Sequence, residues 1–190
     1  NQSRLFEEEL RKLSLNYKVV GNVRFYDRKE IKDIISYLNF LINPEDTISF
    51  ERILNVPKRG IGESTLQKLR DYSNTNEISL SESINNLSKI SNLSERAKKQ
   101  IINFQEIINE LKTFALQGPS ITITKTLELT GYKDELVKEG TLESQMRLEN
   151  LDELITSAFE FENLYEEEVE DPFTVLRDYL ESIALFTDSD

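Results

Sequence analysis

The sequence predicts a mainly α-helical fold, and three observations support this prediction. Apolar residues recur at intervals of three and four positions almost throughout the 190 residues, which is the spacing of one helix face. Capping residues and Gly or Pro stop signals separate these periodic stretches. One short stretch near the N-terminus instead carries the β-branched and aromatic pattern of paired strands. A chain of this length forms one substantial domain and has room for a smaller appendage.

The N-terminal part combines this strand-like stretch with a well-defined helix. YKVVGNVRFYDR, residues 17–28, has strand-forming residues on both sides of Gly21-Asn22, which is typical of a short β-hairpin. Asp27 and Glu30 have the spacing of a capping box. The apolar residues that follow on one helical face are Ile31, Ile34, Ile35, Leu38, Leu41 and Ile42. This helix is expected to end before Asn43-Pro44.

The rest of the chain is expected to form one helix after another. Helices are predicted around residue 50, after residue 62, from residue 79, over residues 94–117, around residues 148–158 and after residue 172. Their start and stop signals are Ser64 with Gln67, Ser79 with Glu82, Gly118-Pro119 and Asp171-Pro172. The stretch ITIT, residues 121–124, fits either a helix or a strand by its period.

The composition excludes several classes of function. The sequence contains no Cys and no His, which removes disulfides, thiol nucleophiles, Ser-His and Cys-His catalysis and the usual zinc sites. No apolar run reaches membrane-spanning length and no secretory signal is present, which favours a reducing, soluble compartment, the cytoplasm. We therefore expect no catalytic residue, no metal site and no membrane partner in this chain.

Charge is distributed unevenly along the chain, whose formal net charge is −12. Eleven acidic residues and a single arginine give residues 160–190 a net charge of −10. Residues 52–70 carry five basic residues and one acid, Glu63, so their net charge is +4. The basic residues are Arg52, Lys58, Arg59, Lys68 and Arg70. A positive patch on an acidic body is predicted, although the overall charge alone would argue against a nucleic-acid partner.

The positive stretch contains a glycine loop, NVPKRGIGESTLQKL, at residues 55–69. Gly60 and Gly62 would let the backbone turn sharply, and the helix behind them would present unpaired amides and the positive end of its dipole. Lys58 and Arg59 would attract an anion, and a phosphate oxygen would come close to the main-chain amides. The alternative is a turn between two helices, in which the glycines serve geometry only and the cations are solvated.

Three further segments complete the reading from residues alone. LELTGYKDEL, residues 127–136, has a glycine turn with Tyr132 and Lys133, although such a segment is more often an ordinary turn. The acidic run YEEEVED, residues 165–171, lacks the ligand spacing of a calcium loop and is interpreted as a solvated linker. No G-x-x-x-x-G-K-[ST] segment is present, so the chain alone is not expected to hydrolyse ATP.

These segments resemble part of the UvrD/PcrA/Rep-type superfamily 1 DNA helicases, and most of all the PcrA type. NQSRLFEEEL is similar to the end of the fourth helicase motif, and YKVVGNVRFYDRKEIKDIISYL to the stretch of the 2A domain that leads into the inserted 2B domain. ILNVPKRGIGESTLQKL resembles the GIG loop of 2B, and LTGYKDEL its later Gly-Tyr hairpin. MRLENLDEL resembles a further motif of 2B, and LESIALFTDSD the return to 2A.

The resemblance implies a division of the chain and a set of DNA contacts. Residues 1–34 would be a partial 2A segment and hinge that includes the β-hairpin, residues 35–187 a multi-helix 2B-type accessory domain, and residues 188–190 the return toward 2A. In this family 2B rotates between open and closed states, and its GIG loop, here residues 60–62, lies on duplex phosphates in the closed state. The implied contacts are Lys58, Arg59, Gly60, Ile61, Gly62, Ser64 and Thr65, with Thr130, Gly131, Tyr132 and Lys133 second, and Arg28 and Lys29 near the hinge as lesser candidates.

The resemblance also implies a function, that of a duplex-DNA-binding, autoregulatory 2B domain of an ATP-dependent 3′ to 5′ DNA helicase of repair and replication. Its partners would be the phosphates of double-stranded DNA, the 1A, 1B and 2A domains of the parent helicase, and further proteins. ATP and Mg would bind the parent and not this segment. The alternative is a module for protein contact or self-association without DNA affinity of its own. Because the acidic C-terminal stretch would repel DNA, it is expected opposite the glycine loop or near the hinge.

Overall fold

A computed structural model describes residues 23–165 and 171–188 of the chain. Every regular element in these two ranges is a helix, which confirms the prediction of a mainly α fold for the part described. The elements are α2 (Val23–Asp27), α3 (Lys29–Ile42), α4 (Thr47–Ile53), α5 (Glu63–Thr75), α6 (Leu80–Ser83), the 3-10 helix η1 (Ile84–Lys89), α7 (Glu95–Ala115), α8 (Pro119–Leu129), α9 (Tyr132–Glu139), α10 (Leu142–Asn163) and α11 (Thr174–Asp188).

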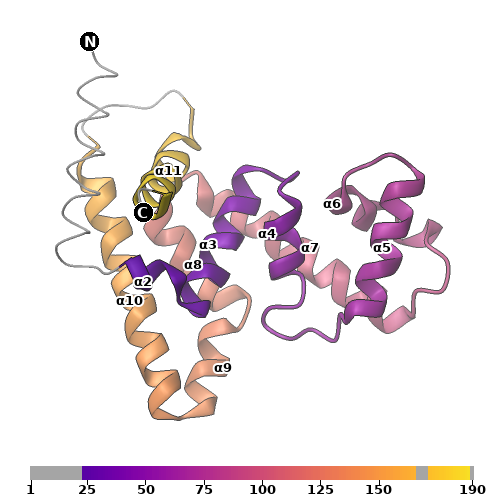
Figure 1. The fold of residues 1–190 in the computed structure, drawn as a ribbon, viewed down its shortest axis with the longest axis horizontal. Coiled ribbons are helices and arrows are strands. Elements are labelled where there is room, and N and C mark those ends of the chain that lie inside the picture. Colours follow the sequence, from indigo (N-terminus) through magenta and orange to yellow (C-terminus); the bar gives the residue numbers. More distant parts are fainter. Residues whose placement is uncertain (1–22, 166–170, 189–190) are drawn as a thin grey trace.

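Helix α3 lies at the centre of the molecule and contacts α2, α4, α7, α8, α10 and α11 (Figure 1). Its residues Ile31, Ile34 and Leu38 are fully buried, as expected for a helix whose apolar face is covered from several sides. An aromatic cluster joins α3, α4 and α7, since the ring of Phe50 lies 5.4 Å from that of Phe40 and 6.1 Å from that of Phe104. Any side chain that α3 carries is therefore placed within reach of several elements at once.

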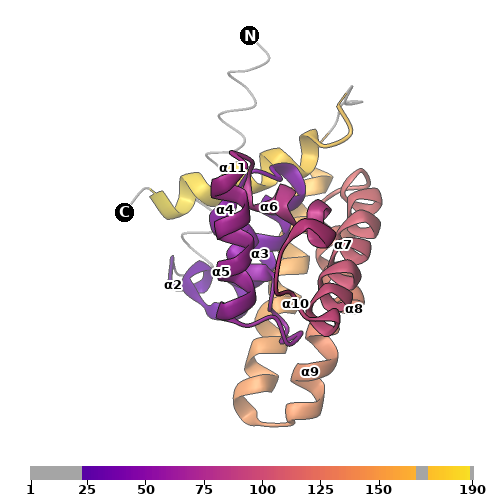
Figure 2. The same ribbon diagram turned by 90° about the vertical axis from the view of Figure 1, so that its right-hand side faces the viewer.

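Two parts of the molecule extend from this centre. Helices α5 and α6 pack on each other at one end, and α9 with the first half of α10 forms a helical hairpin that projects on another side (Figures 1 and 2). Helix α11 packs against α2, α3, α8 and α10, at the end opposite α5 (Figure 1). The described part of the acidic C-terminal stretch therefore lies away from the glycine loop, as the sequence predicted.

Most of the predicted helix boundaries are confirmed. Ser79 and Ser94 cap α6 and α7, because their hydroxyls accept hydrogen bonds from the amides of Glu82 and Ala97 at 3.3 and 3.0 Å. Gly118 separates α7 from α8, whose first residue is Pro119. The ambiguous residues 121–124 are helical. The Asp171 carboxylate accepts from the Phe173 amide at 2.9 Å, just before α11 begins.

The prediction of a β-hairpin is wrong for its second arm. Residues 23–26 lie in helix α2, while residues 17–22 of the first arm fall outside the described residues. The ring of Tyr26 is buried and packs edge-on against Phe186 of α11, with 5.5 Å between the centroids. This packing against a distant helix outweighs the local β propensity of the sequence.

Two predicted capping pairs are also wrong. Helix α3 has Arg28 as its N-cap, without a side-chain hydrogen bond, and Glu30 is instead buried, where it accepts from Asn150 Nδ2 at 2.8 Å. Helix α5 begins directly after Gly62, so Ser64 lies inside its first turn and Gln67 donates to Asp71 at 2.9 Å. The predicted domain boundary after residue 34 falls within α3, which is continuous from Lys29 to Ile42, and the division stays a prediction.

Candidate nucleic-acid interface

The glycine loop connects α4 with α5, and contacts on its buried side hold it in place. Ile61 is buried, with 3% of its surface exposed, whereas Gly60 and Gly62 on either side of it are exposed. The side-chain oxygen of Asn55 accepts from the amides of Arg59 and Ile61 at 2.7 and 3.1 Å. Gly60 has φ +77°, a conformation that favours glycine. One apolar side chain and one amide side chain therefore shape the loop and leave its glycines at the surface.

The first turn of α5 carries unpaired amides next to these glycines. Gly62 is the N-cap and has no side chain to cap the helix, so the amides of Glu63, Ser64 and Thr65 have no partner within α5. Ser64 is exposed and Thr65 is partly buried. Amides at a helix N-terminus, together with the helix dipole, favour an anion. The Glu63 carboxylate is paired with Arg70 at 2.6 Å, which offsets its negative charge at this end of the helix.

Most of the basic residues of the predicted positive patch are bound to other groups of the protein. Arg52 pairs with Asp33 at 3.0 Å, Arg70 pairs with Glu51 at 2.9 Å and with Glu63, and Lys68 Nζ donates to the Asn92 carbonyl at 2.6 Å. Lys58 is exposed and has no hydrogen bond or ion pair with any residue in the described ranges. The patch that is open to a ligand is therefore narrower than the sequence indicates.

Arg59 points into the protein and not toward solvent. Its Nη1 donates to the carbonyls of Ile53 and Leu54 at 2.7 and 3.0 Å, and its Nη2 donates to the Tyr37 hydroxyl. The guanidinium carbon lies 5.0 Å from the centroid of the Phe104 ring, a cation–π contact. Arg59 thus closes the end of α4 and supports the loop from inside, where its side chain is already fully engaged.

The second predicted site, Thr130 to Lys133, forms the turn between α8 and α9. Gly131 adopts a left-handed conformation with φ +78°, and a Cβ added to it would meet open space. The Thr130 hydroxyl accepts from the Tyr132 amide at 3.2 Å. The Tyr132 side chain is buried, whereas Lys133 is exposed and unpaired within the described part of the chain. Lys133 and the turn backbone are therefore the groups that face solvent here.

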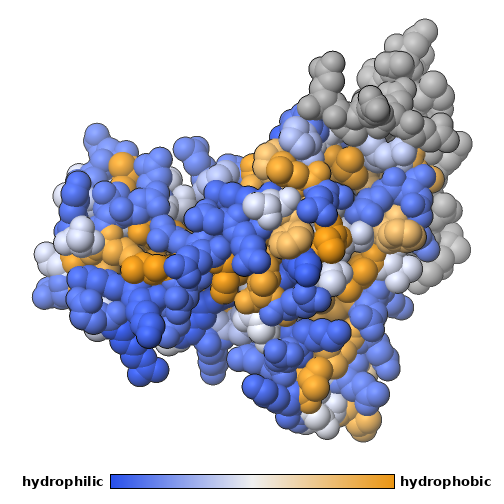
Figure 3. Space-filling model, turned by 180° about the vertical axis from the view of Figure 1, so that it is seen from behind, coloured by the Kyte–Doolittle hydropathy of each residue, from blue (hydrophilic) through white to orange (hydrophobic). Residues whose placement is uncertain are grey.

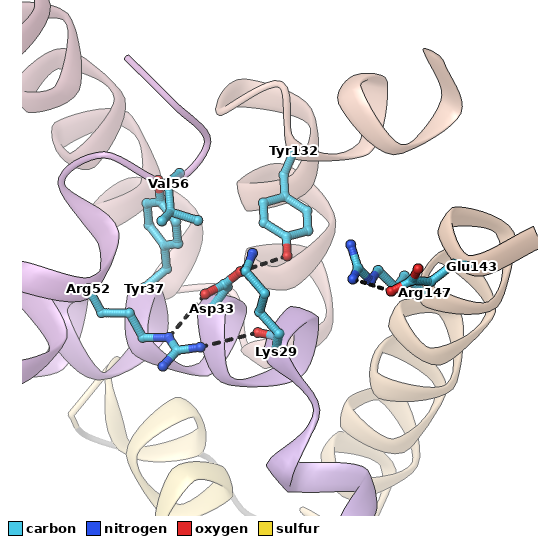
Figure 4. Close-up of polar contacts among 8 residues, drawn as sticks. All are labelled: Lys29, Asp33, Tyr37, Arg52, Val56, Tyr132, Glu143 and Arg147. Carbon is cyan, nitrogen blue, oxygen red and sulfur yellow. Dashed lines mark hydrogen bonds and ion pairs between the residues drawn. The ribbon is translucent and has the colours of Figure 1, made fainter. Parts of the chain in front are cut away.

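Helix α3 connects the two sites (Figure 4). The carboxylate of Asp33, which is 1% exposed, accepts from Tyr132 Oη at 2.8 Å, Arg52 Nε at 3.0 Å and Lys29 Nζ at 3.1 Å. One turn further along α3, the Tyr37 hydroxyl contacts both the Val56 carbonyl and Arg59. The structure thus ties both turns to one helix, and both lie toward the lower side of the body in Figures 1 and 2.

The lesser candidates near the predicted hinge have different surroundings. Lys29 belongs to the Asp33 cluster, and its backbone carbonyl lies 3.5 Å from Arg52 Nη2 (Figure 4). Arg28 is exposed at the N-cap of α3, and its side chain has no partner within the described ranges. Asp33, Tyr37 and Asn55 were not predicted as part of the site. Asn55 stands in the glycine loop, and its residue type often binds nearby amides.

Burial raises the pKa of Tyr132, and the carboxylate of Asp33 raises it further because a tyrosinate beside it would be repelled. Burial also raises the pKa of Tyr37, an effect that the charge of Arg59 opposes. Both hydroxyls are therefore held protonated in the folded protein. They serve as hydrogen-bond donors that fix the two turns and not as acids or bases.

The raised pKa of Tyr132 predicts a loss of stability in alkaline solution. The unfolded chain ionises this hydroxyl near the ordinary value of 10.0, so the stabilisation is complete below that pH and declines as the pH rises above it. We expect the urea midpoint of the unmodified chain to fall more steeply with increasing pH, above about pH 10, than the urea midpoint of Tyr132→Phe. Tyr72→Phe is the matched control, since the Tyr72 hydroxyl has no partner in the described part. Equal slopes in all three proteins would contradict the assignment.

Among the described residues, no three carboxylates come together in a way that would hold a metal ion. None of the described helices has the length and apolar content needed to cross a membrane. What the arrangement offers is a set of backbone amides and lysines at the surface, which suits binding to an extended anion.

The chain is similar to known proteins along its whole length. A family model described as the UvrD-like helicase C-terminal domain matches residues 1–190. The ATP-dependent DNA helicase PcrA of Bacillus subtilis (strain 168) is 39% identical over 190 residues, which cover 100% of this chain and 25% of that protein. The PcrA proteins of Leuconostoc citreum and of Staphylococcus aureus (strain Mu50) are 34% and 40% identical over 100% and 85% of the chain, and 25% and 22% of their own lengths. The chain thus spans about a quarter of the length of these curated relatives.

Proposed function

The chain belongs to the family of UvrD-like helicase C-terminal domains, and on this premise we propose that it is a 2B-type accessory domain that grips duplex DNA. The parent would be a PcrA-like, ATP-dependent 3′ to 5′ DNA helicase of repair and replication in the cytoplasm. ATP and Mg would bind other parts of that helicase and not this segment, and the 1A, 1B and 2A domains would be the partners of the 2B-type domain. The chain would then contribute binding and regulation, and no catalytic step.

The observation that carries this proposal is the exposed glycine loop in front of α5. Gly60 and Gly62 have no side chains that would keep a phosphodiester at a distance, and the first amides of α5 have no partner within the helix. Lys58 lies beside them without a competing carboxylate in the described part. Backbone amides and a lysine bind phosphate but do not distinguish bases, so the grip is expected to be independent of sequence.

The connection through α3 supports the regulatory part of the proposal. Asp33 and Tyr37 tie the turn at Gly131 and the loop at Gly60 to one buried helix, so both turns would move as a unit. If the domain rotates in the parent, both would engage or release the duplex together. A ligand that binds one of two orientations better shifts the population toward it, which is the basis of autoregulation by rotation.

Charge reversal at Lys58 tests the proposed function directly. Lys58→Glu is expected to weaken binding of the 190-residue chain to a short DNA duplex by about tenfold at low salt, because a phosphate contact becomes a repulsion. The measurement is fluorescence anisotropy at two salt concentrations. Lys112→Glu is the matched control, since it makes the same charge change about 24 Å further along the helix that begins beside the loop. The unmodified 190-residue chain should also lose affinity for the duplex steeply as the salt concentration rises.

Absence of duplex binding by the unmodified chain at low salt would overturn the proposal for this chain. Equal losses in the variants at Lys58 and Lys112 would reduce it to a general effect of net charge. Arg59 is unsuitable for this test, because its side chain holds the end of α4 together and its replacement would disturb the fold.

A second candidate function, protein binding or self-association, is favoured by exposed apolar side chains on the helical hairpin. Leu142 and Met146 of α10 are 83% and 56% exposed, and Val137 of α9 is 58% exposed. Figure 3 shows apolar side chains along this projection. A patch of this kind on a monomer often marks a contact site. Binding to a protein or to a second copy that is insensitive to salt, without any affinity for DNA, would favour this function over the first.

A further inference from the structure

Arg96 lies against the glycine loop, although it is 36 positions away in sequence. A Cβ built on Gly60 would lie 3.7 Å from Arg96 Nη2 and 3.9 Å from Arg96 Nε, so the guanidinium is in van der Waals contact range of the glycine. A Cβ would fit at these distances, but the left-handed backbone of residue 60 favours glycine. The loop therefore has an arginine from the first turn of α7 as its neighbour.

The Arg96 side chain is exposed and has no ion pair or hydrogen bond with any residue in the described ranges. This sets it apart from two other cations in this region, Lys98 and Arg70. Lys98 is paired with Glu95 at 3.3 Å, and Arg70 is paired with Glu63 at 2.6 Å. Glu63, which follows the loop, and Glu95, which precedes Arg96, are thus each paired with another cation. The guanidinium beside Gly60 keeps its five donors available.

The position of Arg96 relative to the loop is fixed by two contacts. Lys68 of α5 donates to the Asn92 carbonyl at 2.6 Å, which joins α5 to the turn before α7. The Ser94 hydroxyl accepts from the Ala97 amide at 3.0 Å and caps α7 in the turn that carries Arg96. Figures 1 and 2 show α5 and α7 beginning next to each other. The backbone that carries Arg96 is thus held next to the loop by the fold.

We propose that Arg96 is a further DNA contact, which binds the phosphate next to the one held by the amides of α5. A guanidinium binds two phosphate oxygens at once, and it remains charged at every pH at which the protein is folded. Lys58 and Arg96 would then flank the exposed glycines from two different elements, with the amides between them. The inference rests on the proposed function, because it assigns a residue to the same phosphate-binding surface.

The test is the salt dependence of duplex binding. Arg96→Gln is expected to weaken binding of the 190-residue chain to a short DNA duplex by about fivefold and to reduce the slope of log affinity against log salt by about 0.9, the loss of one phosphate contact. Lys112→Gln, on the same helix, should leave both unchanged. Arg96→Lys should recover the salt slope but only part of the affinity, because lysine restores the charge but cannot bind two phosphate oxygens at once as a guanidinium does. Thermal melting should show all variants folded, since Arg96 has no partner to lose.

The outcomes separate this inference from the proposed function. If the unmodified chain binds DNA and Lys58→Glu weakens that binding, but Arg96→Gln leaves affinity and slope unchanged, the assignment of Arg96 is wrong and the proposed function stands. If the unmodified chain does not bind duplex DNA at low salt, the proposed function fails and this inference fails with it. A fivefold loss without a change in slope would also contradict a phosphate contact.

Discussion

Replacing Asp33 by alanine is expected to lower the free energy of unfolding by about 3–5 kcal/mol. The carboxylate is 1% exposed and accepts hydrogen bonds from Tyr132, Arg52 and Lys29. Its removal would leave a buried tyrosine hydroxyl without an acceptor and a guanidinium without its counter-charge. Loss of one partner from a buried polar cluster costs more than the cluster itself contributes, because here the Tyr132 hydroxyl would stay desolvated without an acceptor.

Urea denaturation measures the effect of Asp33→Ala, and Asp152→Ala is the matched control. The Asp152 side chain is exposed on α10 and has no side-chain partner in the described part of the chain, so its loss should change stability by less than about 0.5 kcal/mol. A double-mutant cycle of Asp33→Ala with Tyr132→Phe should show coupling between the two sites, since they share one hydrogen bond. A loss below about 1 kcal/mol, or additive effects in the cycle, would contradict the role of Asp33 as the link between the turns.

The helices themselves were largely predictable, because their signals are local. The apolar face of α3, the caps at Ser79 and Ser94 and the break at Gly118-Pro119 all depend on residues within four positions of one another. Such patterns reflect backbone hydrogen bonding and one-sided burial, which hold in any tertiary context. The incorrect prediction of a strand also has a physical cause. Residues 23–26 form a helix where Tyr26 packs on Phe186, a contact that no local rule contains.

The site was predictable only in part, for the same reason. The glycines, Lys58 and the first turn of α5 could be identified from one short segment. The hydrogen bond that fixes the second turn joins Asp33 and Tyr132, which are 99 positions apart. Arg96 is brought to Gly60 at the start of α7, which the hydrogen bond from Lys68 to the Asn92 carbonyl joins to α5, and nothing in the neighbouring sequence distinguishes it from Lys98 or Lys99. Sequence patterns therefore located the loop but not the groups that hold it and flank it.

Arg59 shows how charge alone misleads when a sequence is interpreted. Next to Lys58 and in front of Gly60, it has the position of a solvent-facing phosphate ligand. The structure instead directs it to the carbonyls of Ile53 and Leu54 at the C-terminal end of α4. A cation at a helix C-terminus also interacts favourably with the helix dipole. The two adjacent cations therefore differ in role: Lys58 faces solvent, and Arg59 stabilises the fold.

Substitutions at Arg59 and Lys58 should therefore have opposite effects, the first on stability and the second on DNA binding. Arg59→Met keeps an apolar side chain over Phe104 but removes every donor, and it is expected to lower the free energy of unfolding by about 3 kcal/mol. Lys58→Met removes the same charge from an exposed position without a partner, so its urea midpoint should match that of the unmodified chain. Under conditions where Arg59→Met remains folded, its salt slope for duplex DNA should equal that of the parent, whereas the slope of Lys58→Met should be smaller by about 0.9. If Arg59→Met were as stable as Lys58→Met and lost the same slope, Arg59 would bind phosphate, and the contacts to α4 would not hold in solution.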